Sequence, residues 1–250
     1  MRYVEIDIVK GIAVMCMIIF HFFYFPNQYG FKEIKYDTTF LAVLAKIAQV
    51  IFITCVGINL YLSKKTSIEN KETNGEYNKK MIKRIIKIAL LALCMSLFTK
   101  FIFGEKYVKF GILHFIALVS LLLFKFSDNI KIIQILFIGC ILLTYLSSKN
   151  PELFNFIPKQ LSFVLGFNKD YPSVDHFPIL PWILLVFIGI FIGYTLKKYK
   201  IETSKSNNNI SKALEKIGNK SLEIYMIHWI ILYLIFCIIY SKIRKKYSII

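Results

Sequence analysis

The sequence has few acidic residues for its size. Its 15 Asp and Glu stand against 32 Lys and Arg, so the formal net charge is +17. At the same time 56 % of its residues are hydrophobic, which is more than a soluble domain of this length buries and is typical of a membrane protein. The basic residues form short runs between apolar stretches, as in cytoplasmic loops that face anionic lipid. They do not form the basic stripe with interleaved aromatics of nucleic-acid-binding proteins, so we expect no nucleic-acid partner.

Three kinds of chemical motif are also missing. The cysteines are odd in number and all fall inside apolar stretches, which excludes a disulfide framework; they are Cys16, Cys55, Cys94, Cys140 and Cys237. No two of the 4 histidines have the helical i, i+3 or i+4 spacing of metal ligands, so we expect no metal site. A G-x-S-x-G nucleophile motif is absent as well.

The apolar residues form seven stretches that are long enough to cross a bilayer, which takes about 20 residues. We expect them near 8–26, 39–62, 82–103, 109–126, 130–147, 179–196 and 221–241. The Pro-rich segment 148–178 is expected to be a surface or re-entrant loop, and 63–81 and 197–220 to be flexible linkers. The prediction is an all-α polytopic membrane bundle of about seven transmembrane helices, with eight as the alternative, forming one domain over residues 1–250.

The distribution of Lys and Arg predicts the orientation of this bundle. Most of these residues fall at the N-terminus and in the loops after the second, fourth and sixth helices, which predicts a cytoplasmic N-terminus in the cell membrane. The first apolar stretch lacks a small-residue cleavage site, so we expect it to be retained as a helix. The basic tail "KIRKKYSII" disagrees, because seven helices would place it outside. Either the tail is an exception or the helix count is wrong by one.

Ionisable residues lie inside several of these stretches. In the first, Lys10 and His21 are about 16 Å apart along a helix axis. The orientation predicts that five residues converge in the outer half of the membrane: His21, Lys46, His114, Asp175 and His176. His228 is expected nearer the middle or the cytoplasmic side. Ionisable groups at this depth usually line a cavity or a pathway. A single histidine can instead bond a neighbouring helix backbone, but five such residues on one side favour a site.

Four stretches, in order along the chain, resemble one known family. They are "EIDIVKGIAVMCMIIFHF", "FITCVGINLYLS", "KFGILHFIAL", and "DHFPILPWILLVFIGIFIGY" followed by "IGNKSLEIYMIHWIIL". They are similar to bacterial membrane proteins related to the catalytic domain of heparan-alpha-glucosaminide N-acetyltransferase. The Lys-x10-His spacing is also similar to the Arg-x10-His of wider membrane acyltransferases. In the second stretch, Gly57 is expected where the second helix ends.

The resemblance implies acyl transfer, with acetyl-CoA as the expected acyl donor and a glycan outside the cytoplasm as the acceptor. It implies that Lys10, Lys83 and Arg84 bind the CoA phosphates, although the positive-inside rule is the favoured explanation for the last two. His21 is the expected general base or acyl carrier. Asp175 would then hold the tautomer of His21, or simply cap the sixth helix. His114 would stabilise the oxyanion or bind the acceptor.

The expected substrate-binding residues complete this prediction: Lys46, His176, Trp182, Tyr24 and His228, with Tyr171 as a further stacking residue. Aromatic belts at the membrane interface are the alternative for the aromatic ones. The sequence departs from the family at Lys10, where arginine is usual, and at His176, where an aromatic residue is expected. The segment 32–38 also lacks the histidine that the lysosomal enzyme carries after its first helix.

Two rival functions stay open at this point. In a transporter or channel, the histidines would form a proton relay. In a scaffold without catalysis, the polar residues would only join helices. The absence of inverted repeats argues against the transporter. The lipid bilayer is a partner in every reading, and a homo-oligomer remains open, as do the acceptor and the acyl chain.

Overall fold

The computed structural model describes residues 3–28, 38–167, 173–201 and 208–247. Regular structure in these ranges is helical apart from one isolated bridge between Phe110 and His176. The chain divides into two compact units, one made of Met1–Phe52 with Glu202–Ile250 and the other of Ile53–Ile201. The predicted all-α class is confirmed.

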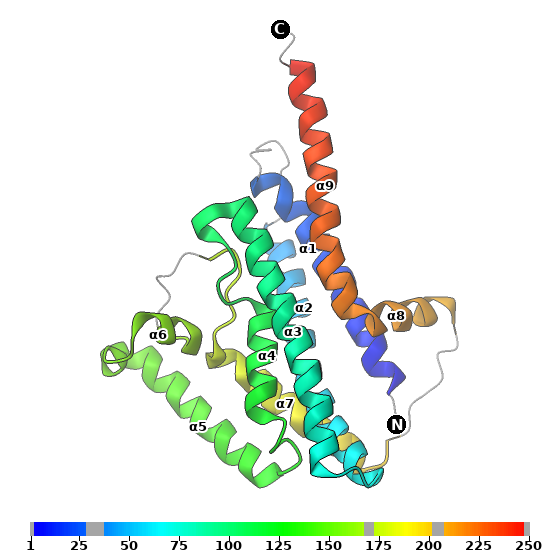
Figure 1. Cartoon of the computed structure of the whole chain (residues 1–250), viewed down its shortest axis with the longest axis vertical. Coiled ribbons are helices and arrows are strands. Elements are labelled where there is room, and N and C mark those ends of the chain that lie inside the picture. Colours follow the sequence, from blue (N-terminus) through cyan, green and yellow to red (C-terminus); the bar gives the residue numbers. More distant parts are fainter. Residues whose placement is uncertain (1–2, 29–37, 168–172, 202–207, 248–250) are drawn as a thin grey trace. The chain divides into compact units, whose positions relative to one another are not determined.

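The first unit is built on helix α1 (Val4–Gln28). It also contains the first part of α2 (Thr38–Glu69), the short α8 (Asn209–Asn219) and α9 (Ser221–Tyr247). Helices α8 and α9 both pack against α1 (Figure 1). The backbones of α1 and α8 approach so closely that a Cβ added at Gly11 would collide with the carbonyl of Leu214, and one at Gly218 with the carbonyl of Asp7. Small residues permit this approach, as they do between membrane helices.

The second unit contains the rest of α2, then α3 (Asn74–Phe103), α4 (Ile112–Leu123), α5 (Ile130–Lys149), α6 (Lys159–Leu165) and α7 (Ile179–Lys198). Two 3₁₀ turns, η1 (Gly104–Lys106) and η2 (Pro151–Phe154), follow α3 and α5. Helix α3 packs against α4, and α5 packs against α7 (Figure 1). Helices α2 and α7 touch through their backbones, because a Cβ at Gly57 would collide with the carbonyl of Val186 and one at Gly189 with that of Thr54.

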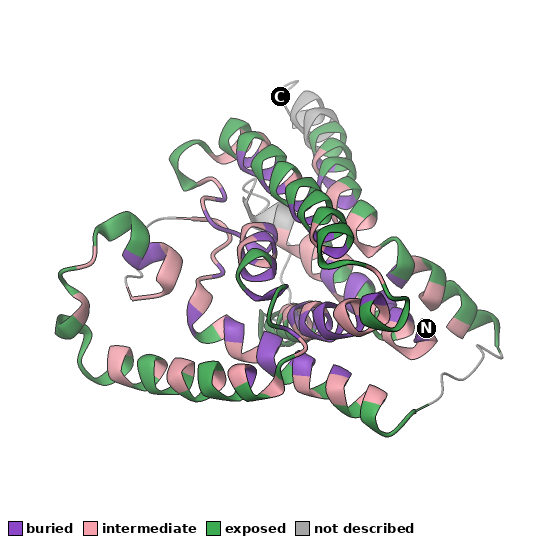
Figure 2. Ribbon diagram, turned by 60° about the horizontal axis from the view of Figure 1, so that its bottom comes forward, coloured by how far each residue is buried: buried purple, intermediate pink, exposed green. Residues whose placement is uncertain are grey.

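On many helices, rows of exposed residues lie beside buried ones (Figure 2), and many of the exposed residues are large and apolar. Leu90 and Leu97 of α3 are 58 % and 61 % exposed, and Ile135 and Ile138 of α5 are 71 % and 67 % exposed. Six helices among the described residues are long and apolar enough to cross a membrane: α1, α2, α3, α5, α7 and α9. Exposed apolar faces of this extent are satisfied by lipid, so the chain is a multi-pass membrane protein.

The two predicted linkers are largely helical, and those predictions were wrong. Helix α2 continues to Glu69 and α3 begins at Asn74, so only residues 70–73 connect them. Thr73 caps α3 in a capping box with Glu76. Gly57 consequently lies inside α2 and not at its end. In the second linker, α8 places Ile210, Leu214 and Ile217 at helical spacing. The polar composition of the two segments correctly indicated that they face solvent. It did not indicate that they lack helical structure.

The fourth predicted span is shorter than expected. Helix α4 has 12 residues, which is about 18 Å of helix and less than the hydrocarbon thickness of about 30 Å. Helices α1 and α9 nevertheless run in the same direction. Asp7 near the start of α1 contacts Gly218, which lies in α8 just before α9 begins, and further along the two helices His21 contacts His228. Two crossings with the same direction need an odd number of crossings between them. Helix α4 with its flanking loops supplies the fifth, which supports seven crossings in place of six or eight.

Candidate functional site

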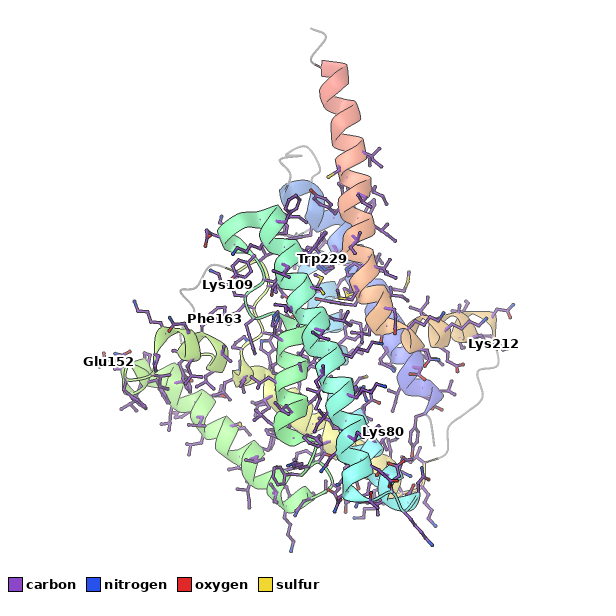
Figure 3. All side chains as sticks on the ribbon, in the orientation of Figure 1. Lys80, Lys109, Glu152, Phe163, Lys212 and Trp229 are labelled. Carbon is purple, nitrogen blue, oxygen red and sulfur yellow. The ribbon has the colours of Figure 1, made fainter. Side chains whose placement is uncertain are left out.

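Two histidines of the first unit lie in contact at membrane depth. Nε2 of His228 on α9 lies 3.3 Å from Nδ1 of His21 on α1, and the ring centroids are 5.0 Å apart. Trp229, labelled in Figure 3, packs its ring 5.0 Å from that of His21. The sequence placed His21 and His228 at different depths, which was wrong. Gly218 of α8 packs against Asp7, which places the start of α9 beside the first turns of α1. Helices α1 and α9 therefore run side by side from there, and His21 and His228 come into contact.

The hydrogen-bond partners assign the protons of this histidine pair. Nδ1–H of His21 donates to the carbonyl of Met17 at 2.9 Å, and Nδ1–H of His228 donates to that of Ile224 at 3.2 Å. Neutral His228 therefore carries its lone pair on Nε2, which faces Nδ1–H of His21. Neutral His21 carries its lone pair on Nε2. A proton taken up there creates an imidazolium whose charge is stabilised by His228.

Lys10 and Asp7 form an ion pair near the start of α1. Asp7 is only 4 % exposed, so the ion pair with Lys10 offsets part of the cost of burying this carboxylate. The sequence analysis did not choose Asp7 as a site residue, although its i, i+3 spacing to Lys10 is a signal for such a pair. Of the other predicted residues of this unit, Tyr24 places its ring 6.4 Å from that of His21, and Lys46 is exposed on α2.

His114 of the second unit has partners for both ring nitrogens. The backbone N–H of Gly111 donates to Nδ1 at 3.3 Å, so neutral His114 carries its proton on Nε2. That proton points to Ser96 Oγ at 3.1 Å, and the Ser96 hydroxyl donates to the carbonyl of Val108 at 2.6 Å. The chain of bonds joins α3, α4 and the loop between them. Ser96 carries no sequence signal of its own, because a serine inside an apolar helix is common.

Asp175 binds the N-terminus of α4. Its Oδ2 accepts a hydrogen bond from the backbone N–H of Ile112 at 3.4 Å, and Ser173 donates to its carbonyl at 2.7 Å. Asp175 therefore caps a helix as expected, but the helix is α4 and not α7, the sixth predicted span. Burial raises the pKa of Asp175 to about 6, and the bond from Ile112 only partly offsets this. His21 belongs to the other unit, so its predicted pairing with Asp175 stays a prediction.

His176 and Trp182 line a cavity of about 860 Å³ in the second unit, within the usual size range of small-molecule sites. Nε2–H of His176 donates to the carbonyl of Phe163 at 2.9 Å, and the two rings stack at 3.8 Å. Burial lowers the pKa of His176, so this imidazole is neutral at pH 7. Phe163 is labelled on α6 in Figure 3. Tyr171 lies outside the described residues.

Lys83 and Arg84 lie in the basic first part of α3. The nearby Lys80, labelled in Figure 3, has an acidic partner, since it pairs with Glu72 at 3.7 Å. No ion pair within the described ranges involves Lys83 or Arg84. Arg84 also lines a small cavity of about 20 Å³ with Asn59 and Ser120. Two cations without carboxylates are suited to an anionic ligand.

No set of three or more metal-ligating side chains occurs in the part of the chain that the structure describes.

Comparison with known families gives one match. Residues 2–230 match the family model described as heparan-alpha-glucosaminide N-acetyltransferase, catalytic. This range includes α1 to α8 and the contact between His21 and His228. It also includes the hydrogen bonds of His114 and Asp175 and the cavity lined by His176 and Trp182. No curated protein and no solved structure matches the chain.

Proposed function

Because the chain belongs to the family of the heparan-alpha-glucosaminide N-acetyltransferase catalytic domain, we propose that it transfers an acetyl group from acetyl-CoA to a glycan outside the cytoplasm. The family and the six apolar helices make it a membrane acyltransferase. The proposal that a histidine base transfers acetyl from acetyl-CoA to a glycan depends mainly on one observation, the contact between His21 and His228 at membrane depth. A neutral imidazole is a suitable base for this reaction, since the nitrogen without a proton can accept one from the attacking group.

The proposed step needs a base and a route for one proton. Acetyl-CoA supplies an activated acyl group as a thioester. Nε2 of His21 removes the proton from the attacking hydroxyl or amine, a new O–C or N–C bond forms, and the C–S bond breaks. His228 stabilises the imidazolium through Nδ1–H of His21. The same proton then returns from His21 to the leaving thiolate, so the enzyme ends unchanged.

Arg84 and Lys83 are the proposed ligands of the acetyl-CoA phosphates. Both lie in the basic part of α3 and have no acidic partner among the described residues, whereas Lys10 is already paired with Asp7. Arginine also offers two parallel N–H donors to a phosphate. Lys10 is therefore the weakest of the three predicted phosphate ligands, and its charge serves Asp7.

Asp175 and His114 are proposed as positioning residues. Their hydrogen bonds lead to Ile112 and to Ser96 and Gly111, all at the start of α4 or on the facing α3. This arrangement fixes the loop from 108 to 111 and the first turn of α4. Their predicted roles, support of His21 by Asp175 and oxyanion stabilisation by His114, stay predictions. For the acceptor, His176 and Trp182 are the best-supported candidates because both line the large cavity.

Thermal unfolding of the purified protein with and without acetyl-CoA tests the donor. A ligand at about 100 times its Kd that binds only the folded state adds about 2.7 kcal/mol, so a clear rise in Tm is expected. Arg84→Ala should weaken this shift. Lys131→Ala, at the start of α5, is the matched control and should retain it. A folded protein with no shift from any acyl-CoA would contradict the proposal.

The same histidine contact also favours one rival, a proton-coupled transporter. In that case proteoliposomes would take up protons with a solute in the absence of any thioester. Uptake of this kind, together with no release of CoA by the wild-type protein, would replace the enzyme proposal.

A further inference from the structure

The large cavity of the second unit has a mixed lining. It is formed by the end of α5, η2, α6 and the start of α7, and its stacked rings include Phe154 on Phe167 with centroids 4.2 Å apart. Trp182 lines it beside these rings. Its hydroxyl and amide side chains are Thr144, Ser147, Ser148, Asn155 and Ser162. Aromatic faces together with many hydroxyl and amide groups are suited to a sugar, whose rings have apolar faces and hydroxyl edges.

Several of these polar groups can accept hydrogen bonds. The hydroxyls of Thr144 and Ser147 donate to the carbonyls of Cys140 and Thr144, so their oxygens keep lone pairs. His176 donates through Nε2–H, so its neutral ring keeps a lone pair on Nδ1. Hydroxyl groups of a ligand would donate to these acceptors.

The charged side chains that line the cavity disfavour a cationic ligand. Among the side chains that the structure describes around this cavity there is no carboxylate, and the charged group is Lys159. Asp175 is directed elsewhere, to the backbone of Ile112. A cationic amino sugar would therefore lose water without gaining a counter-charge, whereas a neutral or acidic sugar would not.

We infer that this cavity binds a neutral or acidic glycan through stacking on Trp182 and hydrogen bonds to its hydroxyls, and that it discriminates against protonated glucosamine. On the proposed function, the acceptor is then a sugar hydroxyl. The ester O–C bond forms as the C–S bond of the thioester breaks, and the hydroxyl proton ends on the CoA thiol. The chain would be an O-acyltransferase within a family described by N-acetyl transfer.

Tryptophan fluorescence tests the binding directly, since the chain has only 2 tryptophans. Trp229→Phe leaves Trp182 as the single reporter. The probes share one β-1,4-glucose backbone: cellotetraose, its uronic acid form, and the glucosamine tetramer. The protein is kept in an amine-oxide detergent, because maltoside detergents are glycosides and would compete. Cellotetraose and the uronic acid form should change the emission of Trp182 at a Kd at least tenfold below that of the glucosamine tetramer at pH 7.

Two variants separate stacking from charge. Trp182→Ala should abolish cellotetraose binding measured by calorimetry. Lys159→Glu should weaken the uronic acid form at least fivefold and leave cellotetraose unchanged, with Lys131→Glu as the control that changes neither. Preferred binding of the glucosamine tetramer, or no response of Trp182 to any probe in a folded protein, would overturn the inference.

The outcome is independent of the donor experiment. Glycan binding without a thermal shift from acetyl-CoA would contradict the proposed acyl transfer and leave the cavity assignment standing. A thermal shift from acetyl-CoA without glycan binding would contradict only the cavity assignment.

Discussion

His21 and His228 show how one contact changes the meaning of two residues. Each ring donates Nδ1–H to a carbonyl of its own helix, one turn earlier. A lone histidine with this bond would be a structural residue of an apolar helix. With Nε2 of His228 3.3 Å from Nδ1 of His21, the pair has a place for an added proton. Their roles are therefore unequal, with His21 as the base and His228 as its support.

His21→Ala should lower kcat by about 10²- to 10⁴-fold, the usual contribution of a general base. His228→Gln should lower kcat less, shift the pH profile of the rate, and leave the KM for acetyl-CoA unchanged, because it acts through His21. Release of CoA measured from pH 5.5 to 9 checks both. Equal losses with an unchanged pH profile would show that His228 serves only packing. Tm of each variant controls for folding.

Asp175 gives a separate prediction on stability. Its pKa is about 6 in the folded protein, against about 3.9 for an unfolded aspartate. Between these values the folded state binds more protons than the unfolded state, so stability falls as pH rises from about 4 to 6 and is then constant. Asp175→Asn keeps an acceptor for Ile112 and should remove this fall.

Thermal unfolding of wild type and Asp175→Asn from pH 4 to 7.5 measures this difference. The variant should gain up to about 3 kcal/mol relative to wild type between the two ends, as an upper limit for a shift of about 2 pKa units. Asp128→Asn, in the loop after α4, should keep the wild-type slope. Parallel curves for all three proteins would refute the assignment.

At the scale of elements, backbone contacts between helices decide the packing. Gly57 and Gly189 let α2 and α7 touch along their backbones, where a side chain has no space. In a membrane, such close approach replaces the hydrophobic effect as the force that holds helices together. The crossing of α2 and α7 therefore depends on two glycines as well as on buried neighbours such as Val186 and Ile190.

Gly57→Ala should destabilise the protein by about 1–3 kcal/mol, because its Cβ would push the α7 backbone away. Gly139→Ala is the matched control. Gly139 lies in α5 with no atom within 4 Å of an added Cβ, so alanine there should be neutral or stabilise the helix by up to about 1 kcal/mol. Tm in detergent compares the two variants. A Gly57→Ala protein as stable as Gly139→Ala would show that the helices can separate without cost.

At the scale of the whole molecule, the number of crossings determines the sides of the termini. Helices α1 and α9 run in the same direction, and the basic tail follows α9. An odd number of crossings therefore places the N-terminus and the tail on opposite sides, against the positive charge of the tail. The predicted cytoplasmic N-terminus then leaves the tail outside.

Reporter fusions at the two ends of the full chain should locate them on opposite sides of the membrane. A phosphatase reporter at the C-terminus should be active only outside the cytoplasm, and a fluorescent reporter at the N-terminus should fluoresce inside. Both ends in the cytoplasm would mean an even number of crossings. In that case α4 with its flanking loops would not form a membrane crossing.

The sequence alone determined the class of this protein. The long apolar runs require helices in a membrane, because only internal hydrogen bonding satisfies a backbone in lipid. The order of the four motifs indicated the family, which the match over residues 2–230 confirms. These properties depend on composition and local order. They need no knowledge of which helices meet.

Only the tertiary structure decided which polar residues meet. His228 was assigned to a different depth from His21, although the start of the last helix was predicted correctly, because the sequence did not show that Gly218 packs against Asp7. Asp175 and His114 both lie in the second unit, where their side chains accept hydrogen bonds from the backbone N–H groups of Ile112 and Gly111 at the start of α4. Partner choice depends on helix direction and backbone approach, which arise from contacts between residues far apart in the chain, such as Gly11 with Leu214.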